Sequence, residues 1–294
     1  LKFPGIHTET VVSAREDREI RKQVITPGDY NLVPYEDSRC KVAINEIKSE
    51  NYSGPCKIDP DSRVFNSSFD GYILIGDSDH FIDKDFELII QQMCCGEICA
   101  ATMVYRDNQG VVKLKISCKI ELKDVTDEQL ISDWGQMRLY EAALHHKERG
   151  VELVKQKKVM DAFRRFNKSL KMLVAIEPVD PEKVGDELIG QMMDLKIKLY
   201  NNLAHCQLQY SEYDAALKLC NNVLKLDPGN TKALYRRSTA YTGLELYEEA
   251  WNDIQKVITL DPHDKSAQQK ASLLKPKIEK IQHDYSNVIK KMFT

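Results

Sequence analysis

The densest group of reactive side chains in this sequence is a cysteine cluster formed by Cys94, Cys95 and Cys99. Thiolates at short spacing can bind zinc, and a structural zinc site takes four ligands from Cys and His residues. The chain has eight cysteines but no C-x-x-C pair, and no histidine lies at ligand spacing from the cluster. The pattern is typical of reduced, mostly buried thiols, so we expect no metal and no cofactor.

A second group is acidic and consists of Asp77, Asp79, Asp83 and Asp85. Alternating carboxylates of this kind can bind Ca²⁺. A calcium loop also needs a glycine at the turn and a closing Glu at the twelfth position, and this segment has neither. We therefore expect an acidic, solvated loop that precedes a short helix.

A third group is basic and polar and contains Asn202, Lys232 and Arg236. Lys232 and Arg236 are four residues apart, which places them on one face of a helix. Asn202 precedes Arg236 by 34 residues, which is the period of an internal repeat, so both side chains face the same groove. Such donors form charge-assisted hydrogen bonds to carboxylates. The alternative is that Lys232 and Arg236 belong to a solvated basic surface.

The repeat with the 34-residue period positions this third group. Asp227-Pro228 recurs as Asp261-Pro262, and Ala216 recurs as Ala250. Each unit contains small residues twelve positions apart, where two antiparallel helices must approach closely. The pairs are Ala204 and Ala216, Ser238 and Ala250, and, in an earlier diverged copy, Gly150 and Ala162. This is the tetratricopeptide (TPR) signature, so we expect three TPR repeats and a long C-terminal helix that covers the last apolar face.

The front half of the chain has a different pattern. Alternating apolar residues predict a strand at 40–47, a hairpin joins strands at 98–105 and 111–122, and one short helix is expected at 86–92. About five strands around one helix make an α+β domain. The predicted fold class is therefore α+β, with an N-terminal antiparallel β-sheet and one short helix, followed by an all-α TPR array with an extended C-terminal helix.

Charge and hydropathy narrow the function classes. Residues 1–130 carry 16 basic and 23 acidic side chains, a net charge of −7, while residues 131–294 carry 26 and 22, a net charge of +4. Neither half has the basicity of a typical nucleic-acid binder. No apolar run reaches the roughly 18–20 residues of a membrane helix. We expect a cytoplasmic protein, with the nucleus as a second compartment, and no nucleic-acid or membrane partner.

The expected domains are an N-terminal extension at 1–19, a β-rich domain at 20–125, a linker at 126–134, and the TPR array at 135–294. The β-rich domain contains VITPGD at 24–29, RVFNSS at 63–68, YILIG at 72–76 and QMCCGE at 92–97. These segments resemble the FKBP domain, and the whole pattern resembles the TPR-containing immunophilins of the FKBP type. The resemblance covers residues 20–123 and 135–294.

The resemblance implies a prolyl isomerase pocket, a cup of aromatic rings with a Trp floor. In this sequence the Trp position resembles Phe86, Ile44 and Ile116 replace two aromatic residues, and Asn66 replaces an Asp. Phe65 is the one residue of the cup that is kept, and the long loop that normally covers the cup is cut to residues 105–110. Catalysis needs a desolvated pocket shaped for the twisted amide. We therefore expect no isomerase activity and no macrolide ligand.

The resemblance also implies two protein partners. TPR co-chaperones hold the acidic C-terminal tail of a heat-shock chaperone with a two-carboxylate clamp, whose positions correspond here to Lys147, Val151, Asn202, Lys232 and Arg236. Val151 departs from the usual Asn. A degenerate FKBP domain on a TPR array further implies an adaptor for a casein kinase I type kinase (Doubletime) with a circadian role. The first hypothesis is the kinase adaptor, and the alternative is a co-chaperone of the 90-kDa heat-shock chaperone with weak or no prolyl isomerase activity.

Overall fold

The computed structural model describes residues 9–50, 62–65, 68–126, 133–177 and 185–292. The chain divides into two compact units, Leu1–Trp134 and Gly135–Thr294, which are described separately. Most of the expected linker, residues 127–132, lies outside the described residues.

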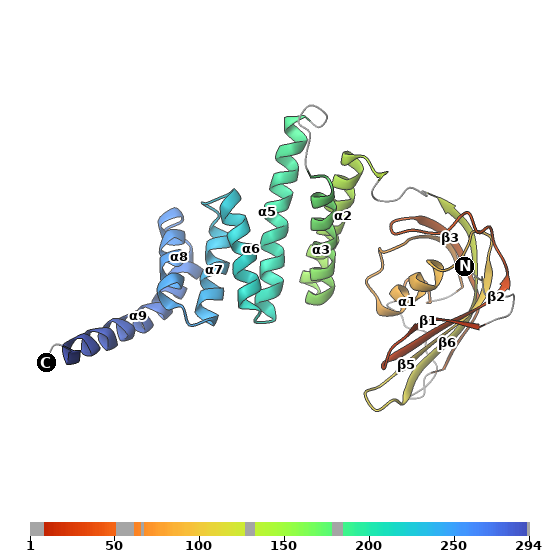
Figure 1. Ribbon diagram of the computed structural model, residues 1–294, viewed down its shortest axis with the longest axis horizontal. Helices are drawn as coiled ribbons and strands as arrows, with labels where there is room; N and C mark the ends of the chain where they lie inside the picture. Colours follow the sequence, from red (N-terminus) through yellow and green to blue (C-terminus); the bar gives the residue numbers. More distant parts are fainter. Residues whose placement is uncertain (1–8, 51–61, 66–67, 127–132, 178–184, 293–294) are drawn as a thin grey trace. The chain divides into compact units, whose positions relative to one another are not determined.

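The front unit is a six-stranded antiparallel sheet with the strand order β1-β2-β5-β6-β3-β4. The sheet curves around one helix, α1 (Phe81–Ile90), which lies against its concave face (Figure 1). This agrees with the predicted α+β class. The strands are β1 (Glu9–Ala14), β2 (Arg18–Thr26), β3 (Arg39–Glu50), β4 (Phe69–Leu74), β5 (Ile98–Arg106) and β6 (Val112–Thr126).

The core of the front unit lies between α1 and the sheet. Strand β3 supplies Cys40, Val42 and Ile44, which alternate along the strand and are fully buried. Helix α1 supplies Ile82 and Phe86 from one face, since positions four apart lie on the same side of a helix. The period of two in the strand and of about four in the helix explains why the sequence pattern identified these elements.

The sheet extends further toward the N-terminus than expected. The sequence analysis placed residues 1–19 outside the sheet, but Glu9–Ala14 forms β1, which pairs with β2 from Glu9↔Gln23 to Ala14↔Glu19. As an edge strand, β1 buries few side chains, and Val11 is 56% exposed. An edge strand of this kind leaves only a weak apolar alternation in the sequence.

The prediction of an acidic, solvated loop is wrong for Asp83 and Asp85. Both residues lie in α1, which begins five positions before the predicted start, and they are 1% and 0% exposed. Asp83 accepts hydrogen bonds from Ser62 Oγ and from the backbone N–H of Arg63 (2.8 Å). Asp85 forms an ion pair with Arg18 at 2.7 Å. The hydrogen bonds to Asp83 offset the cost of burying its carboxylate, whereas burial outweighs the charge of Arg18 and raises the pKa of Asp85.

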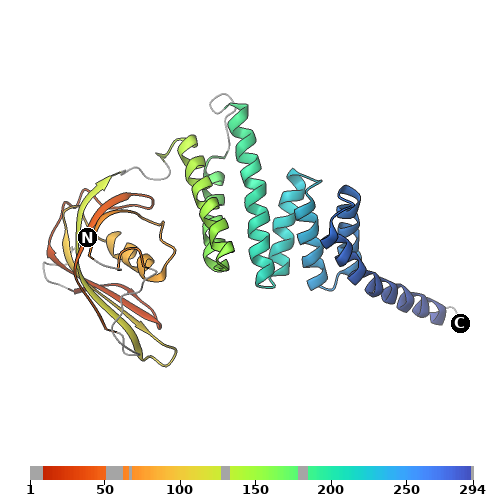
Figure 2. The ribbon, with the colours of Figure 1, turned by 180° about the vertical axis from the view of Figure 1, so that it is seen from behind.

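The back unit is a stack of helix pairs (Figures 1 and 2). Within residues 133–177 and 185–292 there are three pairs followed by a terminal helix, as the repeat pattern predicted. The helices are α2 (Gln136–Lys155), α3 (Val159–Ala175), α5 (Asp186–Gln209), α6 (Tyr213–Leu226), α7 (Thr231–Gly243), α8 (Tyr247–Leu260) and α9 (Lys265–Met292).

Small residues allow the two helices of each pair to pack closely. A Cβ atom on Gly150 of α2 would lie 2.5 Å from the ring of Phe166 in α3, so no larger residue fits there without a shift. In the last pair, Ser238 of α7 is fully buried and donates a hydrogen bond to the carbonyl oxygen of Ala250 in α8 at 2.7 Å. The twelve-residue spacing of small residues therefore marks the contacts within the pairs.

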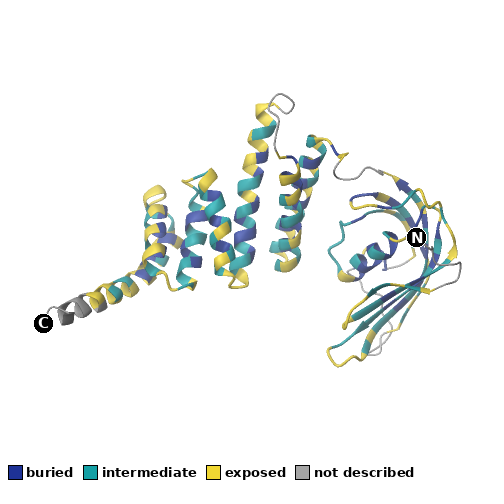
Figure 3. Ribbon diagram, viewed as in Figure 1, coloured by how far each residue is buried: buried dark blue, intermediate teal, exposed yellow. Residues whose placement is uncertain are grey.

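Helix α9 covers the end of the array with one face. Ala267, Ala271 and Leu274 are buried against α7 and α8, whereas Leu273 is 66% exposed. Figure 3 shows the buried stripe ending as α9 extends beyond the last pair. Among the helices that the structure describes, none is both long enough and apolar enough to cross a membrane.

Candidate functional site

A groove in the back unit brings together the residues expected to bind carboxylates. Its walls come from α2, α5, α7 and the turn that precedes α7, and its cavity volume is about 600 Å³. All five positions of the expected clamp line it: Lys147, Val151, Asn202, Lys232 and Arg236. We call this space the clamp chamber.

Arg236 is the central group of the clamp chamber. Its half-buried guanidinium donates from Nη1 to Oδ1 of Asn201 at 2.9 Å. Burial lowers the pKa of Arg236 from its ordinary value, because no carboxylate offsets the desolvation. Within the described residues, Arg236 has no acidic partner within 4.0 Å. A desolvated cation without an anion is costly, and an anionic ligand would relieve that cost.

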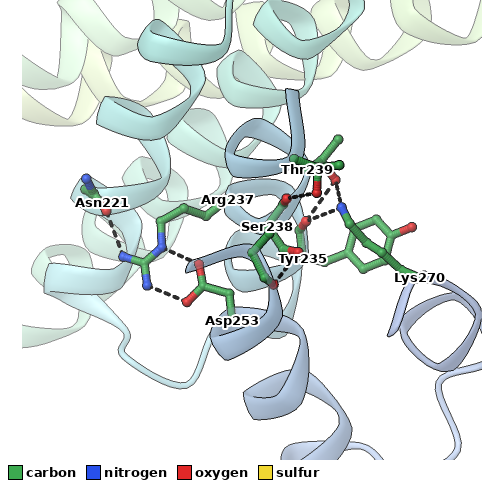
Figure 4. A network of polar contacts seen from close by, with 9 residues as sticks. Asn221, Tyr235, Arg237, Ser238, Thr239, Asp253 and Lys270 are labelled. Atoms are coloured by element: carbon green, nitrogen blue, oxygen red, sulfur yellow. Dashed lines mark hydrogen bonds and ion pairs between the residues drawn. The ribbon is translucent and has the colours of Figure 1, made fainter. Parts of the chain in front are cut away.

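The neighbouring arginine shows the contrast. Arg237 donates from Nε and Nη2 to the two carboxylate oxygens of Asp253 at 2.6 and 2.7 Å, and from Nη1 to Asn221 at 2.7 Å (Figure 4). These bonds connect α7 to α8 and α6. Asp253 raises the pKa of Arg237. The two adjacent arginines of α7 therefore have different roles. Arg237 connects helices within the array, whereas Arg236 lines the clamp chamber.

Two asparagines hold Arg236 in place. Asn201 of α5 is 6% exposed, accepts from Arg236, and donates from Nδ2 to Oδ1 of Asn230 at 3.3 Å. Asn230 caps α7 by accepting from the backbone N–H of Ala233 at 3.0 Å. The repeat spacing predicted Asn202 as a site residue but not Asn201. The repeat could not reveal it, because Tyr235 occupies the corresponding position one period later.

The other charges leave the clamp chamber with unpaired cations. Asp194 forms an ion pair with Lys198. Asp227 accepts from Asn230 Nδ2 at 3.0 Å and from the Gly229 N–H at 3.2 Å. In the part of the array that the structure covers, Lys147, Lys232 and Arg236 have no carboxylate within 4.0 Å. The lining carries four cationic and two acidic side chains, a net charge of +2, and Lys147, Lys232 and Arg236 are its cations without an ion-pair partner.

A further hollow of about 500 Å³ adjoins the clamp chamber between α5, α7 and α9, and we call it the second chamber. The two spaces share Thr231, Lys232 and Arg236. Burial and the charge of Arg236 lower the pKa of His205 in its wall, so this imidazole is neutral at pH 7. The remaining lining residues are Leu208, Gln209, Tyr235, Thr239, Asp264 and Ser266.

The described residues that the resemblance places in an FKBP cup lie in the core of the front unit. Ile44, Phe65, Phe86 and Ile116 are at most 3% exposed. The rings of Phe65 and Phe86 meet edge to face, with centroids 5.4 Å apart. Asn66 lies outside the described residues. The four side chains fill space with one another and with the surrounding core, in the manner of ordinary packing.

Comparison with known proteins fits this architecture. Two tetratricopeptide repeat models match residues 197–230 and 231–264. Mouse FK506-binding protein-like is 29% identical over 60% of this chain and 47% of its own length. Human peptidyl-prolyl cis-trans isomerase FKBP4 is 30% identical over 46% of this chain and 28% of its own length. The chain thus spans less than half of the length of these relatives.

One solved structure supports the fold. The crystal structure of residues 1–211 of CG17282 matches with a TM-score of 0.54 and 24% identity, covering 71% of this chain and 97% of that one. The fold is therefore an FKBP-like antiparallel sheet followed by a TPR array. Within that fold class, the sequence matches relate this chain to FK506-binding immunophilins of the FKBP4 type.

Proposed function

We propose that this protein is a non-catalytic co-chaperone whose clamp chamber binds the acidic C-terminal tail of a 90-kDa heat-shock chaperone in the cytoplasm or nucleus. The observation that carries the proposal is the half-buried guanidinium of Arg236, which faces a groove without a carboxylate partner among the described residues. Lys147 and Lys232 line the same groove. Three cations in one concave site of net positive charge favour a ligand with several carboxylates.

The chemistry of binding follows from the donors. A terminal aspartate offers a main-chain and a side-chain carboxylate, and Lys147, Asn202, Lys232 and Arg236 can donate to them. A hydrogen bond to a charged group contributes about 1.5–3 kcal/mol. Because Asn201 already orients Arg236, less side-chain entropy is lost on binding.

The front unit is, in this proposal, a binding or spacer domain. Rotation about an X–Pro bond has a barrier of roughly 20 kcal/mol, and an enzyme lowers it only with a pocket complementary to the twisted amide. Close packing among Ile44, Phe65, Phe86 and Ile116 supports a domain without that pocket.

The kinase hypothesis is the second candidate. The pairing of a degenerate FKBP-like domain with a TPR array resembles the insect protein Bride of doubletime, and that resemblance implies a casein kinase I type client with a circadian role. The geometry of the clamp chamber favours the chaperone tail, since its chemistry matches carboxylates directly. Kinase binding would use another surface and is compatible with an occupied groove.

Calorimetric titration of the full chain with an acetylated peptide ending in Met-Glu-Glu-Val-Asp tests the proposed function. We expect Arg236→Ala to weaken binding about tenfold, which corresponds to about 1.4 kcal/mol. Arg149→Ala is the matched control, because Arg149 pairs with Glu152 at 2.7 Å and does not line the clamp chamber. No binding of the wild type up to millimolar peptide would overturn the proposal.

A further inference from the structure

Lys270 of α9 is a second half-buried cation next to the groove. Its Nζ donates to Oγ1 of Thr239, lies 3.5 Å from the carbonyl oxygen of Tyr235, and stands over the Tyr235 ring at 4.6 Å from the centroid. Thr239 and Tyr235 both line the second chamber. Figure 4 shows Lys270 on the side of α7 opposite to the Arg237–Asp253 pair.

Lys270 has no anionic partner among the residues of the array that the structure places. Burial alone lowers its pKa to about 8, without a compensating contribution from any acid. The one carboxylate in the wall of the second chamber, that of Asp264, accepts from the backbone N–H groups of Ser266 and Ala267 at 2.8 and 3.0 Å. Asp264 therefore caps the N-terminus of α9 and forms no ion pair with Lys270.

The two chambers adjoin, which limits what could reach Lys270. Both chambers border α5 and α7 and share Thr231, Lys232 and Arg236; α2 adds to the wall of the clamp chamber, and the start of α9 adds to that of the second chamber. Packed helices are about 10 Å apart, and an extended peptide advances roughly 3.3 Å per residue. A tail anchored by its last residue in the clamp chamber would therefore place the residue about three positions upstream in the second chamber.

We propose that Lys270 and the second chamber select an acidic side chain about three residues before the C-terminus of the bound tail. This inference rests on the proposed function, since it takes the anchored tail as given. The ammonium of Lys270 donates to the carboxylate of that residue, and the ring of Tyr235 packs against its methylene groups. In a tail ending Glu-Glu-Val-Asp, the selected residue is the first Glu.

A double-mutant cycle on the full chain tests this. Two acetylated peptides, ending in Glu-Glu-Val-Asp and in Gln-Glu-Val-Asp, are titrated into the wild type and into Lys270→Gln. We expect the wild type to bind the Gln peptide about fivefold more weakly, and Lys270→Gln to bind both peptides equally. Lys277→Gln is the matched control, because Lys277 of the same helix stands over the ring of Tyr247, which does not line the second chamber, at 4.3 Å, whereas Lys270 contacts the lining residues Thr239 and Tyr235.

The outcomes separate the two claims. If the wild type binds neither peptide, the proposed function fails and this inference fails with it. If the wild type binds both peptides equally, the clamp stands and the role of Lys270 is overturned. The third outcome is that Lys270→Gln keeps the wild-type melting temperature and still binds the Glu peptide about fivefold more tightly than the Gln peptide. In that case another group binds the upstream carboxylate, and the assignment to Lys270 is overturned.

Discussion

At the scale of single residues, the groove is defined by which cations lack an acid. Arg236 and Arg237 are adjacent and chemically identical, yet Arg237 is paired with Asp253 and Arg236 faces the clamp chamber, held by Asn201. Burying a charge without a partner costs stability, and an anionic ligand would offset that cost. The spacing of Lys232 and Arg236 predicted that they share a helix face. Only the structure shows that Arg236 is half-buried and which residues it contacts.

Val151 is the one clamp position that departs from the expected amide. It is half-buried and lines the clamp chamber beside Lys147. Val151→Asn adds a donor that can reach a peptide carboxylate, so we expect affinity for a Glu-Glu-Val-Asp peptide to rise about threefold, as measured by calorimetry. Val151→Leu is the control that changes size without adding a donor. Weaker binding by Val151→Asn than by Val151→Leu would contradict the expected geometry.

Lys270 gives a pH dependence of stability with a defined sign. Burial lowers its pKa from about 10.5 to about 8, so the unfolded chain binds the proton more tightly than the folded chain. The free energy of unfolding should therefore rise with pH between about 8 and 10.5, where the folded state has lost this buried charge.

Urea unfolding of the wild type and of Lys270→Met across this range measures the effect. We expect the wild type to gain stability relative to the variant as the pH rises from 8 to 10.5, and the difference to stay constant below pH 7. A difference that is independent of pH throughout would show that Lys270 is fully solvated in the folded protein.

At the scale of elements, the stability of the TPR array depends on close packing between the two helices of each pair. Gly150→Ala places a methyl group about 2.5 Å from the Phe166 ring, so the buried ring or the two helices must shift. We expect a loss of about 1–3 kcal/mol in the free energy of unfolding, measured by urea titration. Gly190→Ala in α5 is the control, since no atom lies within 4 Å of the added Cβ, and it should stabilise by up to about 1 kcal/mol. Equal effects of the two substitutions would contradict this packing.

The sequence predicted the elements best where a periodic pattern coincided with burial. The 34-residue period located α5 to α8, and the alternation at 40–47 located β3. The hydrophobic pattern did not predict elements that bury few side chains or that bury polar side chains. Strand β1 lies at a sheet edge and has few buried residues. Asp83 and Asp85 are acidic residues typical of a solvated loop, yet both are buried in α1.

The groove was predictable only in part. Spacing placed Asn202, Lys232 and Arg236 together, and the family resemblance added Lys147 and Val151. Asn201 was not found, because Tyr235 stands one period later and the repeat gives no polar signal there. Lys270 was missed although it lies 34 residues after Arg236, in register with Asn202 and Arg236, so the period could have indicated it. Contacts between α5 and α7 depend on side-chain directions that a period does not encode.

At the scale of the whole molecule, we expect the back unit to bind the peptide tail. We expect the front unit to act as a binding or spacer domain that has no isomerase activity. In a chymotrypsin-coupled assay with a proline peptide, we expect the full chain to give no rate above the uncatalysed one. The reason is that the side chains expected to line an isomerase cup are packed in the core: Ile44, Phe65, Phe86 and Ile116. A rate enhancement that Phe86→Ala abolishes would establish an active pocket.

Rapamycin provides an independent measurement on the same unit. A ligand at 100 times its dissociation constant stabilises a protein by about 2.7 kcal/mol, which a thermal shift detects readily. We expect no shift of the melting temperature with rapamycin. A clear upward shift would show that the front unit retains a macrolide site.

The central claim is that the clamp chamber recognises a C-terminal carboxylate, and one comparison tests it most directly. The full chain is titrated by calorimetry with two acetylated peptides of identical sequence ending in Glu-Glu-Val-Asp, one with a free C-terminal carboxylate and one with a C-terminal amide. The positive charges of Lys147, Lys232 and Arg236 predict binding of the free acid and at least tenfold weaker binding of the amide. Equal affinity for the two peptides, or binding of neither, would contradict the account.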